Sequence, residues 1–317
     1  MSRFADDGAS GAAPAGTDPL GQGLVRRIAD QLARLESAPL APGLYLVATP
    51  IGNLADITVR ALHVLAAADM IYCEDTRHSA RLLQHYGIAN ETRPFHEHNE
   101  DGERIRVLKQ LVEGKRIALI SDAGTPLVSD PGFKLVRACA EQGIAVTCIP
   151  GPSAVMTGLA ASGLPTDQFF YAGFLPPKQA ARRARLADLK PVPGTLIFYE
   201  APQRTAETLA DMAEVLGARP AVVARELTKL HEEFARGPLG ALAGEMAARE
   251  VKGEVVILVG PSAKSVVADE EIAQRLAVAL ETMRLKDAAA AVADALGIAK
   301  SRVYDLGLKI KDNTPGR

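Results

Sequence analysis

The sequence predicts an α/β protein with a parallel first sheet. The prediction rests on the pattern of strands, loops and helices in residues 117–154. Two apolar runs, 117–120 and 144–149, have the length of buried strands. Each is followed by a loop of small and turn-forming residues and then by a helix. Asp130 and Ser153 stand where they would cap these two helices. Such strand–loop–helix units build parallel sheets with right-handed crossovers.

Similar patterns predict the remaining elements. We expect helices at about 58–67, 100–113 and 156–161, and a turn at 162–166 that separates two α/β lobes, 43–162 and 163–262. Three helices at about 269–284, 286–296 and 301–311 follow, and the last two are joined by a short glycine-containing turn, as in a helix-turn-helix. They predict a small helical domain over 268–312. Further strands are expected at 44–48, 70–73, 169–174, 195–200, 221–226 and 254–260.

The N-terminal segment, residues 1–42, is expected to be a flexible appendage. Residues 1–18 are rich in Gly, Ala, Ser, Pro and Asp and show no apolar period. Residues 23–36 have the spacing of a short amphipathic helix of unknown role.

The composition is that of a globular chain of about two domains, with 317 residues, 48% of them hydrophobic and 23% charged. A formal net charge of −2 gives no overall basic footprint, so any surface for nucleic acid must be local. Cys73, Cys139 and Cys148 show neither Cys-x-x-Cys nor zinc-ligand spacing, and we interpret them as buried thiols in a reducing compartment. No apolar stretch reaches about 18 residues and no signal-peptide core is visible, so a cytoplasmic protein without a membrane partner is expected.

The expected ligand site lies at the loops 121–126 and 150–152. Both follow predicted parallel strands, and ligands bind beyond the carboxyl ends of such strands. Small residues there let the backbone approach a ligand closely. No strand is followed by Gly-x-Gly-x-x-Gly, and no Walker A sequence is present. Hydroxyl-bearing loops with few charges suit a nucleoside-like ligand better than a triphosphate.

Three polar clusters have more than one interpretation. Glu74-Asp75-Thr76-Arg77 ends a strand and either orients a hydroxyl or a phosphate, or supplies a helix cap and an ion pair. His96-x-His98 lacks a completing ligand set, so we expect no metal and place this loop beside the substrate cleft. The densest basic run is either a solvated helix face or a set of phosphate contacts, and consists of Lys178, Arg182, Arg183, Arg185 and Lys190.

Long motifs in the chain resemble the tetrapyrrole-methylase superfamily, the class III S-adenosylmethionine (SAM)-dependent methyltransferases. They are GLYLVATPIGNLADIT at 43–58, SDAGTPLVSDPG at 121–132 and PGPSA at 150–154. The resemblance covers about residues 43–312. It implies two α/β lobes, a mostly parallel first sheet, a mixed second sheet and SAM folded between the lobes. TPIGN, CEDTR and SDAGTPLVSDPG resemble the branch that methylates the ribose 2′-hydroxyl of a decoding-centre cytidine in 16S rRNA.

The resemblance also implies particular residues and partners. The implied partners are 16S rRNA in the small ribosomal subunit and a second copy of the chain in a homodimer. From motif position, we hypothesise that Glu74 or Asp75 orients or deprotonates the hydroxyl, while Arg77 and Lys229 hold phosphate or charge nearby. In relatives an aspartate often stands where this chain has Thr125, so the cofactor contact there is open. The implied cofactor-binding residues are Pro50, Ile51, Gly124, Thr125, Val128, Ser129, Ser153, Ala154 and Tyr199.

Two other function classes compete with this interpretation. One is a small-molecule SAM methyltransferase acting on a corrinoid-type tetrapyrrole, which would need no basic appendage. The predicted helix-turn-helix with Lys300, Arg302, Lys309 and Lys311 argues against it. The other is a non-catalytic SAM-sensing RNA-binding protein, which would bind the cofactor without turnover.

Overall fold

The first sheet is parallel throughout and has helices on both faces, as seen in a computed structural model that describes residues 22–262, 269–296 and 298–312. Its strand order is β3-β2-β4-β1-β5, which places β1 between β4 and β5. The predicted parallel sheet is therefore confirmed. Its strands are β1 (Gly43–Val47), β2 (Met70–Cys73), β3 (Thr92–Pro94), β4 (Arg116–Ile120) and β5 (Val146–Ile149).

Apolar side chains on the two faces of this sheet form two separate cores. Helices α2 (Val59–Ala67) and α3 (Thr76–His85) cover one face, and α4 (Glu100–Val112) and α5 (Phe133–Glu141) cover the other. Thr58 caps α2 by accepting a hydrogen bond from the Ala61 amide. A further helix, α1 (Gln22–Glu36), precedes the sheet and contacts α2.

The second sheet is mixed, with the order β6-β7-β10-β8-β9. Strands β6 and β7 are parallel, while β10 runs antiparallel to both β7 and β8. This confirms the predicted mixed sheet. Its strands are β6 (Phe169–Phe174), β7 (Thr195–Glu200), β8 (Pro220–Arg225), β9 (Glu233–Pro238) and β10 (Val255–Val259).

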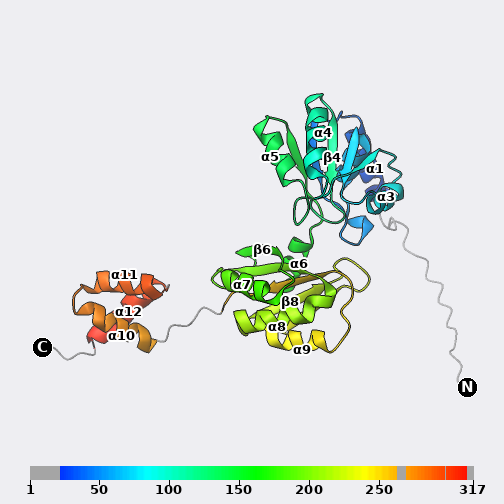
Figure 1. Cartoon of the computed structure of the whole chain (residues 1–317). Coiled ribbons are helices and arrows are strands. Elements are labelled where there is room, and N and C mark those ends of the chain that lie inside the picture. Colours follow the sequence, from blue (N-terminus) through cyan, green and yellow to red (C-terminus); the bar gives the residue numbers. More distant parts are fainter. Residues whose placement is uncertain (1–21, 263–268, 297, 313–317) are drawn as a thin grey trace, which may run out of the picture.

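Three helices pack on one face of the second sheet: α7 (Gln179–Leu189), α8 (Thr205–Leu216) and α9 (Leu239–Ala247). The opposite face receives α6 (Ala154–Ser162), which follows β5 and leads from the first sheet to the second (Figure 1). Ile51, in the loop after β1, joins this same core. The two sheets are therefore linked by shared apolar packing. Two short 3₁₀ helices lie at Leu54–Asp56 and Pro202–Arg204.

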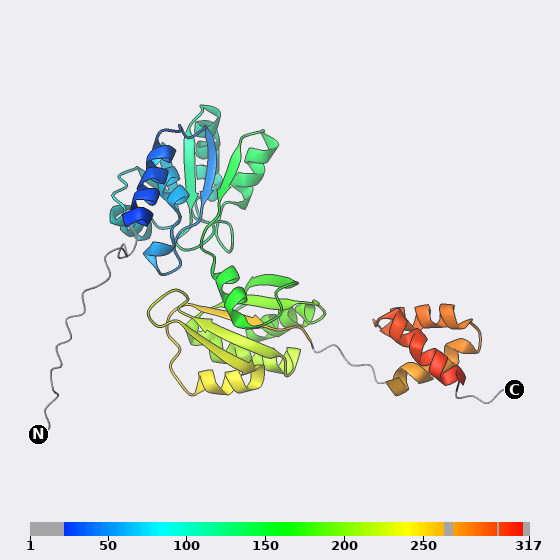
Figure 2. The ribbon, with the colours of Figure 1, turned by 180° about the vertical axis from the view of Figure 1, so that it is seen from behind.

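The C-terminal helices α10 (Asp269–Leu280), α11 (Leu285–Leu296) and α12 (Lys300–Asp312) form a bundle with a core of its own (Figure 2). Ile272, Leu276, Val292 and Val303 are buried in it. The predicted small helical domain thus consists of three helices. Arg302 forms an ion pair with Asp269, with 2.7 Å between Nη2 and Oδ1.

Two strands and one thiol differ from the sequence prediction. Strands β3 and β9 were not predicted, because both are edge strands whose residues are only partly buried and form no apolar run. Cys148 is exposed rather than buried, since β5 is also an edge strand, whereas Cys73 and Cys139 are buried as expected. Of the predicted flexible segment 1–42, residues 1–21 lie outside the described residues.

Candidate active site

Three loops at the carboxyl edge of the first sheet are bound to one another. Thr49, directly after β1, exchanges two backbone hydrogen bonds with Gly124, with N···O distances of 2.9 and 3.0 Å. The Thr125 hydroxyl donates to the Pro152 carbonyl at 3.1 Å. Gly124 has a φ of +82°, a backbone conformation that glycine adopts without strain. The loops after β1, β4 and β5 therefore form one fixed edge.

A cavity of about 400 Å³ lies between this edge and the second sheet. Ile51, Val128 and Ala154 give it an apolar wall, and Phe174 and Tyr199 give it an aromatic one. Asp122, Asp130 and Glu254 add carboxylates. Both sheets thus contribute to a concave site with apolar and aromatic walls and several carboxylates, and such mixed linings are typical of small-molecule pockets. We call it the inter-lobe cavity.

The loop after β4 is held against the second sheet in a strained conformation. Leu127 and Ser129 have φ angles of +71° and +67°, which are uncommon for residues with a side chain. Ser129 Oγ lies 2.5 Å from the Tyr171 hydroxyl. The Tyr171 ring packs edge-on against Tyr199, with 5.2 Å between ring centroids. Burial raises the pKa of both tyrosines, so both phenols stay neutral near pH 7.

Carboxylates gather where the loops after β2 and β4 meet. Burial raises the pKa of Asp130 to about 6, and the negative charge of Glu74 adds to the shift. Burial and the charge of Asp122 likewise raise the pKa of Glu74. Asp122 is fixed by the Asp75 backbone amide, which donates to its Oδ1 at 3.0 Å. Asp130 lines the inter-lobe cavity, and a perturbed carboxyl group in a cavity indicates a functional site.

Sequence reasoning misassigned one of these carboxylates and did not single out another. The prediction that Asp130 caps a helix is wrong, because α5 begins at Phe133 and its N-cap is Gly132. Asp130 faces the cavity instead. Asp122 was not singled out. The available signal was the repeated Ser-Asp pair, Ser121-Asp122 and Ser129-Asp130, in one loop at a strand end.

Five of the nine residues expected to bind the cofactor line the inter-lobe cavity: Ile51, Val128, Ser129, Ala154 and Tyr199. Gly124, Thr125 and Ser153 lie in the loops that carry these residues but outside the lining. Pro50 lines a second cavity, on the α3 side of the loop after β1.

None of the four residues expected to be catalytic is part of the cavity lining. Asp75 caps α3 through the Arg77 amide at 2.8 Å, and also pairs with the exposed Arg77 guanidinium at 3.2 Å. Glu74 is half-buried beside Asp122 and Asp130. Lys229 Nζ lies 2.9 Å from Glu226 and 3.2 Å from Glu254, so two carboxylates neutralise it. Of these partners, Glu254 lines the cavity.

The structure separates the basic run on α7 into structural and exposed residues. Arg182 is fully buried and pairs with Asp211 at 2.6 Å and with Glu207. Both interpretations of the basic run, a solvated helix face and a set of phosphate contacts, are therefore wrong for Arg182. Arg183 also pairs with Asp211, at 2.7 Å. Lys178, Arg185 and Lys190 are exposed.

The part of the chain that the structure describes contains neither a metal-ligand cluster nor a membrane-spanning helix. Within it, no three or more His, Cys, Asp and Glu side chains are grouped as a metal site would require. None of its helices has both the length and the apolar character to cross a membrane.

The fold and the loop edge correspond to a known family. The family model described as "Tetrapyrrole (Corrin/Porphyrin) Methylases" matches residues 43–243, and one described as "RsmI C-terminal HTH domain" matches residues 266–311. The chain therefore belongs to the tetrapyrrole methylase family, as the motifs predicted.

Curated relatives narrow this assignment. A protein of Mesorhizobium japonicum is 50% identical over 282 residues, which cover 88% of this chain and 96% of the relative. An Escherichia coli O157:H7 protein is 47% identical, over 84% of this chain and 94% of the relative. Both are named "Ribosomal RNA small subunit methyltransferase I". Within the family, this chain therefore belongs to the group of proteins with that name.

Solved structures share the fold at low sequence identity. A diphthine synthase superimposes with a TM-score of 0.55 at 14% identity, over 68% of this chain and 89% of that chain. The methyltransferase CobJ gives 0.53 at 21% identity, over 70% and 95%. These similarities concern the two α/β lobes and their arrangement.

Proposed function

We propose that this chain is a cytoplasmic SAM-dependent methyltransferase of 16S rRNA that methylates the ribose 2′-hydroxyl of a cytidine in the decoding centre. The observation that carries the proposal is the inter-lobe cavity, built where the family motifs meet. Relatives that match nearly their whole length to this chain are named rRNA methyltransferases, which supports an RNA substrate. The cytidine and its 2′-hydroxyl come from the motif resemblance described above.

The residues of the inter-lobe cavity fit SAM. An adenosyl group is flat and largely apolar, and Ile51, Val128 and Tyr199 offer it such surfaces. The sulfonium and the ammonium group are cations, and Asp130 and Glu254 are carboxylates that line the same cavity. We therefore propose that the nine residues named from the resemblance hold SAM directly or shape the loops that do.

SAM, when bound, supplies a methyl group on a sulfonium sulfur, which is a good leaving group. The chain must place the acceptor oxygen in line with that methyl, and positioning of this kind contributes roughly 7–11 kcal/mol. A ribose hydroxyl is a weak nucleophile, so a carboxylate within hydrogen-bond reach assists by accepting its proton. The group formed by Glu74, Asp122 and Asp130 provides such carboxylates.

The four residues predicted from motif position have different supporting observations. Arg77 engages both carboxylate oxygens of Asp75. This favours Glu74 over Asp75 as the residue that orients or deprotonates the hydroxyl. Arg77 is 91% exposed, so its guanidinium is accessible to an RNA phosphate. Lys229 contacts the loop after β1, since a Cβ on Gly52 would lie 2.4 Å from its Cγ. We propose that Lys229 acts by holding that loop.

Methyl transfer from labelled SAM tests this function and separates it from its alternatives. The acceptors are undermodified small ribosomal subunits, free 16S rRNA and a tetrapyrrole intermediate. Label in RNA supports the proposal, and label only in the tetrapyrrole would establish the small-molecule alternative. Cofactor binding without transfer to any acceptor would indicate a SAM-sensing RNA-binding protein.

A homodimer is the proposed assembly, on the resemblance alone. Light scattering on the purified chain tests it, and a mass of about 67 kDa is expected, twice the 33.5 kDa of one chain. A monomer at assay concentration would contradict it.

A further inference from the structure

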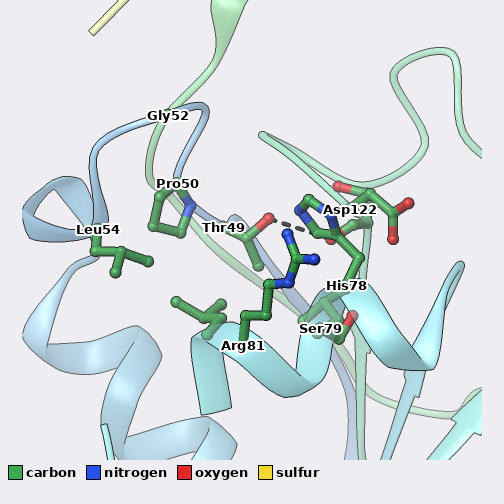
Figure 3. A pocket seen from close by; sticks show the side chains of 11 residues that line it. Thr49, Pro50, Gly52, Leu54, His78, Ser79, Arg81 and Asp122 are labelled. Carbon is green, nitrogen blue, oxygen red and sulfur yellow. Dashed lines mark hydrogen bonds between the residues drawn. The ribbon is translucent and has the colours of Figure 1, made fainter. Parts of the chain in front are cut away.

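A second cavity of about 270 Å³ lies on the α3 side of the loop after β1 (Figure 3). Pro50, Leu54, Leu82 and Ile120 give it apolar walls. His78 and Arg81 extend from α3 toward the loop that carries Asp122. We call it the α3 cavity. It is smaller than the roughly 300–1,000 Å³ of drug-sized ligand sites, so any part of an RNA that enters it is no larger than one nucleotide.

The two cavities share one lining residue, Asp122. The bridge between Thr49 and Gly124 lies beside it and fixes the loops that carry both linings. Asp122 therefore faces the proposed methyl donor on one side and the α3 cavity on the other. A group that accepts a proton during methyl transfer must stand at such a boundary.

The carboxylate of Asp122 is oriented, with one oxygen available. Oδ1 accepts from the Asp75 backbone amide at 3.0 Å. Oδ2 has no hydrogen-bond partner among the residues that the structure describes, so it can accept from a hydroxyl. Glu74 lines neither cavity, although it lies close enough to Asp122 for their charges to interact.

The guanidinium at the rim of the α3 cavity, that of Arg81, is also available. The Arg81 guanidinium is exposed and forms no ion pair or hydrogen bond with any described residue. Many other arginines of the chain are ion-paired, including Arg77, Arg182 and Arg183. An unpaired guanidinium beside a mostly apolar cavity complements a phosphate attached to a base.

From this arrangement, which rests on the proposed function, we propose that the α3 cavity receives the target nucleotide of the RNA. Its base lies against Pro50 and Leu82, and Arg81 binds its phosphate. Asp122 Oδ2 accepts the proton of the 2′-hydroxyl as the oxygen bonds to the methyl carbon and the carbon–sulfur bond breaks. The products are a 2′-O-methylated nucleotide, S-adenosylhomocysteine and a protonated Asp122, which then releases its proton to water.

Steady-state methylation of undermodified small subunits, with the SAM Kd measured by calorimetry, tests this assignment. Asp122→Asn keeps the oxygen that accepts from the Asp75 amide, so the loop is retained, and kcat is expected to fall about 100-fold or more. The SAM Kd should change less than tenfold. Glu74→Gln serves as the rival variant. If Glu74→Gln abolishes turnover while Asp122→Asn leaves kcat intact, the assignment of the proton acceptor is overturned.

Two further variants test the occupant of the cavity. Arg81→Ala should raise KM about tenfold with kcat retained. The slope of the logarithm of the RNA-binding constant against the logarithm of the salt concentration should fall by about one, because one phosphate contact is lost. Leu54→Trp fills the cavity from an exposed position and should reduce kcat/KM at least tenfold. The matched controls are Arg137→Ala on α5 and Ile105→Trp on α4, both exposed and outside the two cavities.

The outcomes separate this inference from the proposed function. If the native chain transfers no methyl to RNA, the proposed function fails. If it does, but Arg81→Ala and Leu54→Trp behave like their controls, only the α3 cavity assignment fails. A SAM Kd raised more than tenfold by Leu54→Trp would assign the cavity to the cofactor and overturn the inference.

Discussion

The hydroxyls of Ser129 and Tyr171 lie 2.5 Å apart and join the loop after β4 to strand β6 of the second sheet. Ser129 makes this contact from a left-handed backbone conformation, with φ of +67°. Gly173, in the same strand, lies beside this contact, and a Cβ there would stand at an ordinary van der Waals distance of 3.6 Å from Ser129 Oγ. Ser129 lines the inter-lobe cavity, and Tyr171 packs against Tyr199, which also lines it. Backbone strain is therefore found where the two lobes meet around the proposed cofactor.

Removal of this contact should weaken SAM binding without unfolding the protein. A neutral hydrogen bond contributes about 1 kcal/mol, so Tyr171→Phe is expected to raise the SAM Kd about fivefold. Tyr304→Phe, on α12, is the matched control. Isothermal calorimetry at pH 7.5 measures both variants. Equal affinities for Tyr171→Phe and the native chain would show that the contact does not shape the cavity.

The affinity for SAM should depend on the charge of Asp130. Its pKa is raised to about 6, so the carboxyl is charged above that pH and neutral below it. A charged Asp130 attracts the cationic groups of SAM, and we expect the Kd to rise about tenfold as the pH falls from 7 to 5. Asp130→Asn should bind SAM more weakly at pH 7 and lack most of this dependence. Parallel pH profiles in both proteins would contradict the role given to Asp130.

The charged Asp130 carboxylate should lower the folding stability of the protein without SAM. Its folded pKa, about 6, exceeds the ordinary value of 3.8, so the folded state binds the proton more tightly than the unfolded state. Stability is therefore lost as the pH rises from about 4 to about 6, and the loss stays constant above that. After discounting for partial exposure, Asp130→Asn should gain about 1 kcal/mol at pH 8, and nothing below pH 4.

Thermal melts at pH 4 and pH 8 measure this difference. Asp188→Asn, an exposed position on α7, is the control and should shift the Tm at neither pH. An equal rise in the Tm of Asp130→Asn at pH 4 and at pH 8 would show that the effect comes from the amide itself and is independent of the charge.

The buried pair of Arg182 and Asp211 should be important for folding and unimportant for RNA binding. Both side chains are at most 1% exposed, and loss of one partner leaves an uncompensated charge. Arg182→Ala is expected to cost about 3–5 kcal/mol, whereas Arg185→Ala, exposed on the same helix, should cost less than about 0.5 kcal/mol. Urea unfolding measures both. Equal small effects would show that the second lobe does not depend on this pair.

The sequence predicted the parallel first sheet because buried strands such as 117–120 are continuous apolar runs. The strands Thr92–Pro94 and Glu233–Pro238 contain no apolar run and were missed for that reason. The shared core of Ile51, Leu159 and Leu227 joins segments far apart in the sequence, so no local pattern shows it.

Side-chain roles were harder to predict than strands. Asp130 precedes Pro131 and Gly132, a pattern typical of a helix start, but the helix begins later and the carboxylate faces the cavity. Arg182 stands in a basic run, and only the fold brings Asp211 and Glu207 against it. Charged residues on one element are paired by partners on another, so the pattern of one helix does not decide their exposure.

The most direct test of the central claim is the identity of the methylated nucleoside. Undermodified small subunits are incubated with the chain and labelled SAM, and the RNA is digested to nucleosides and separated by chromatography with mass detection. We predict label in 2′-O-methylcytidine, with at most one methyl group per subunit. Label on a base, or no label in RNA while a tetrapyrrole is methylated, would contradict the account.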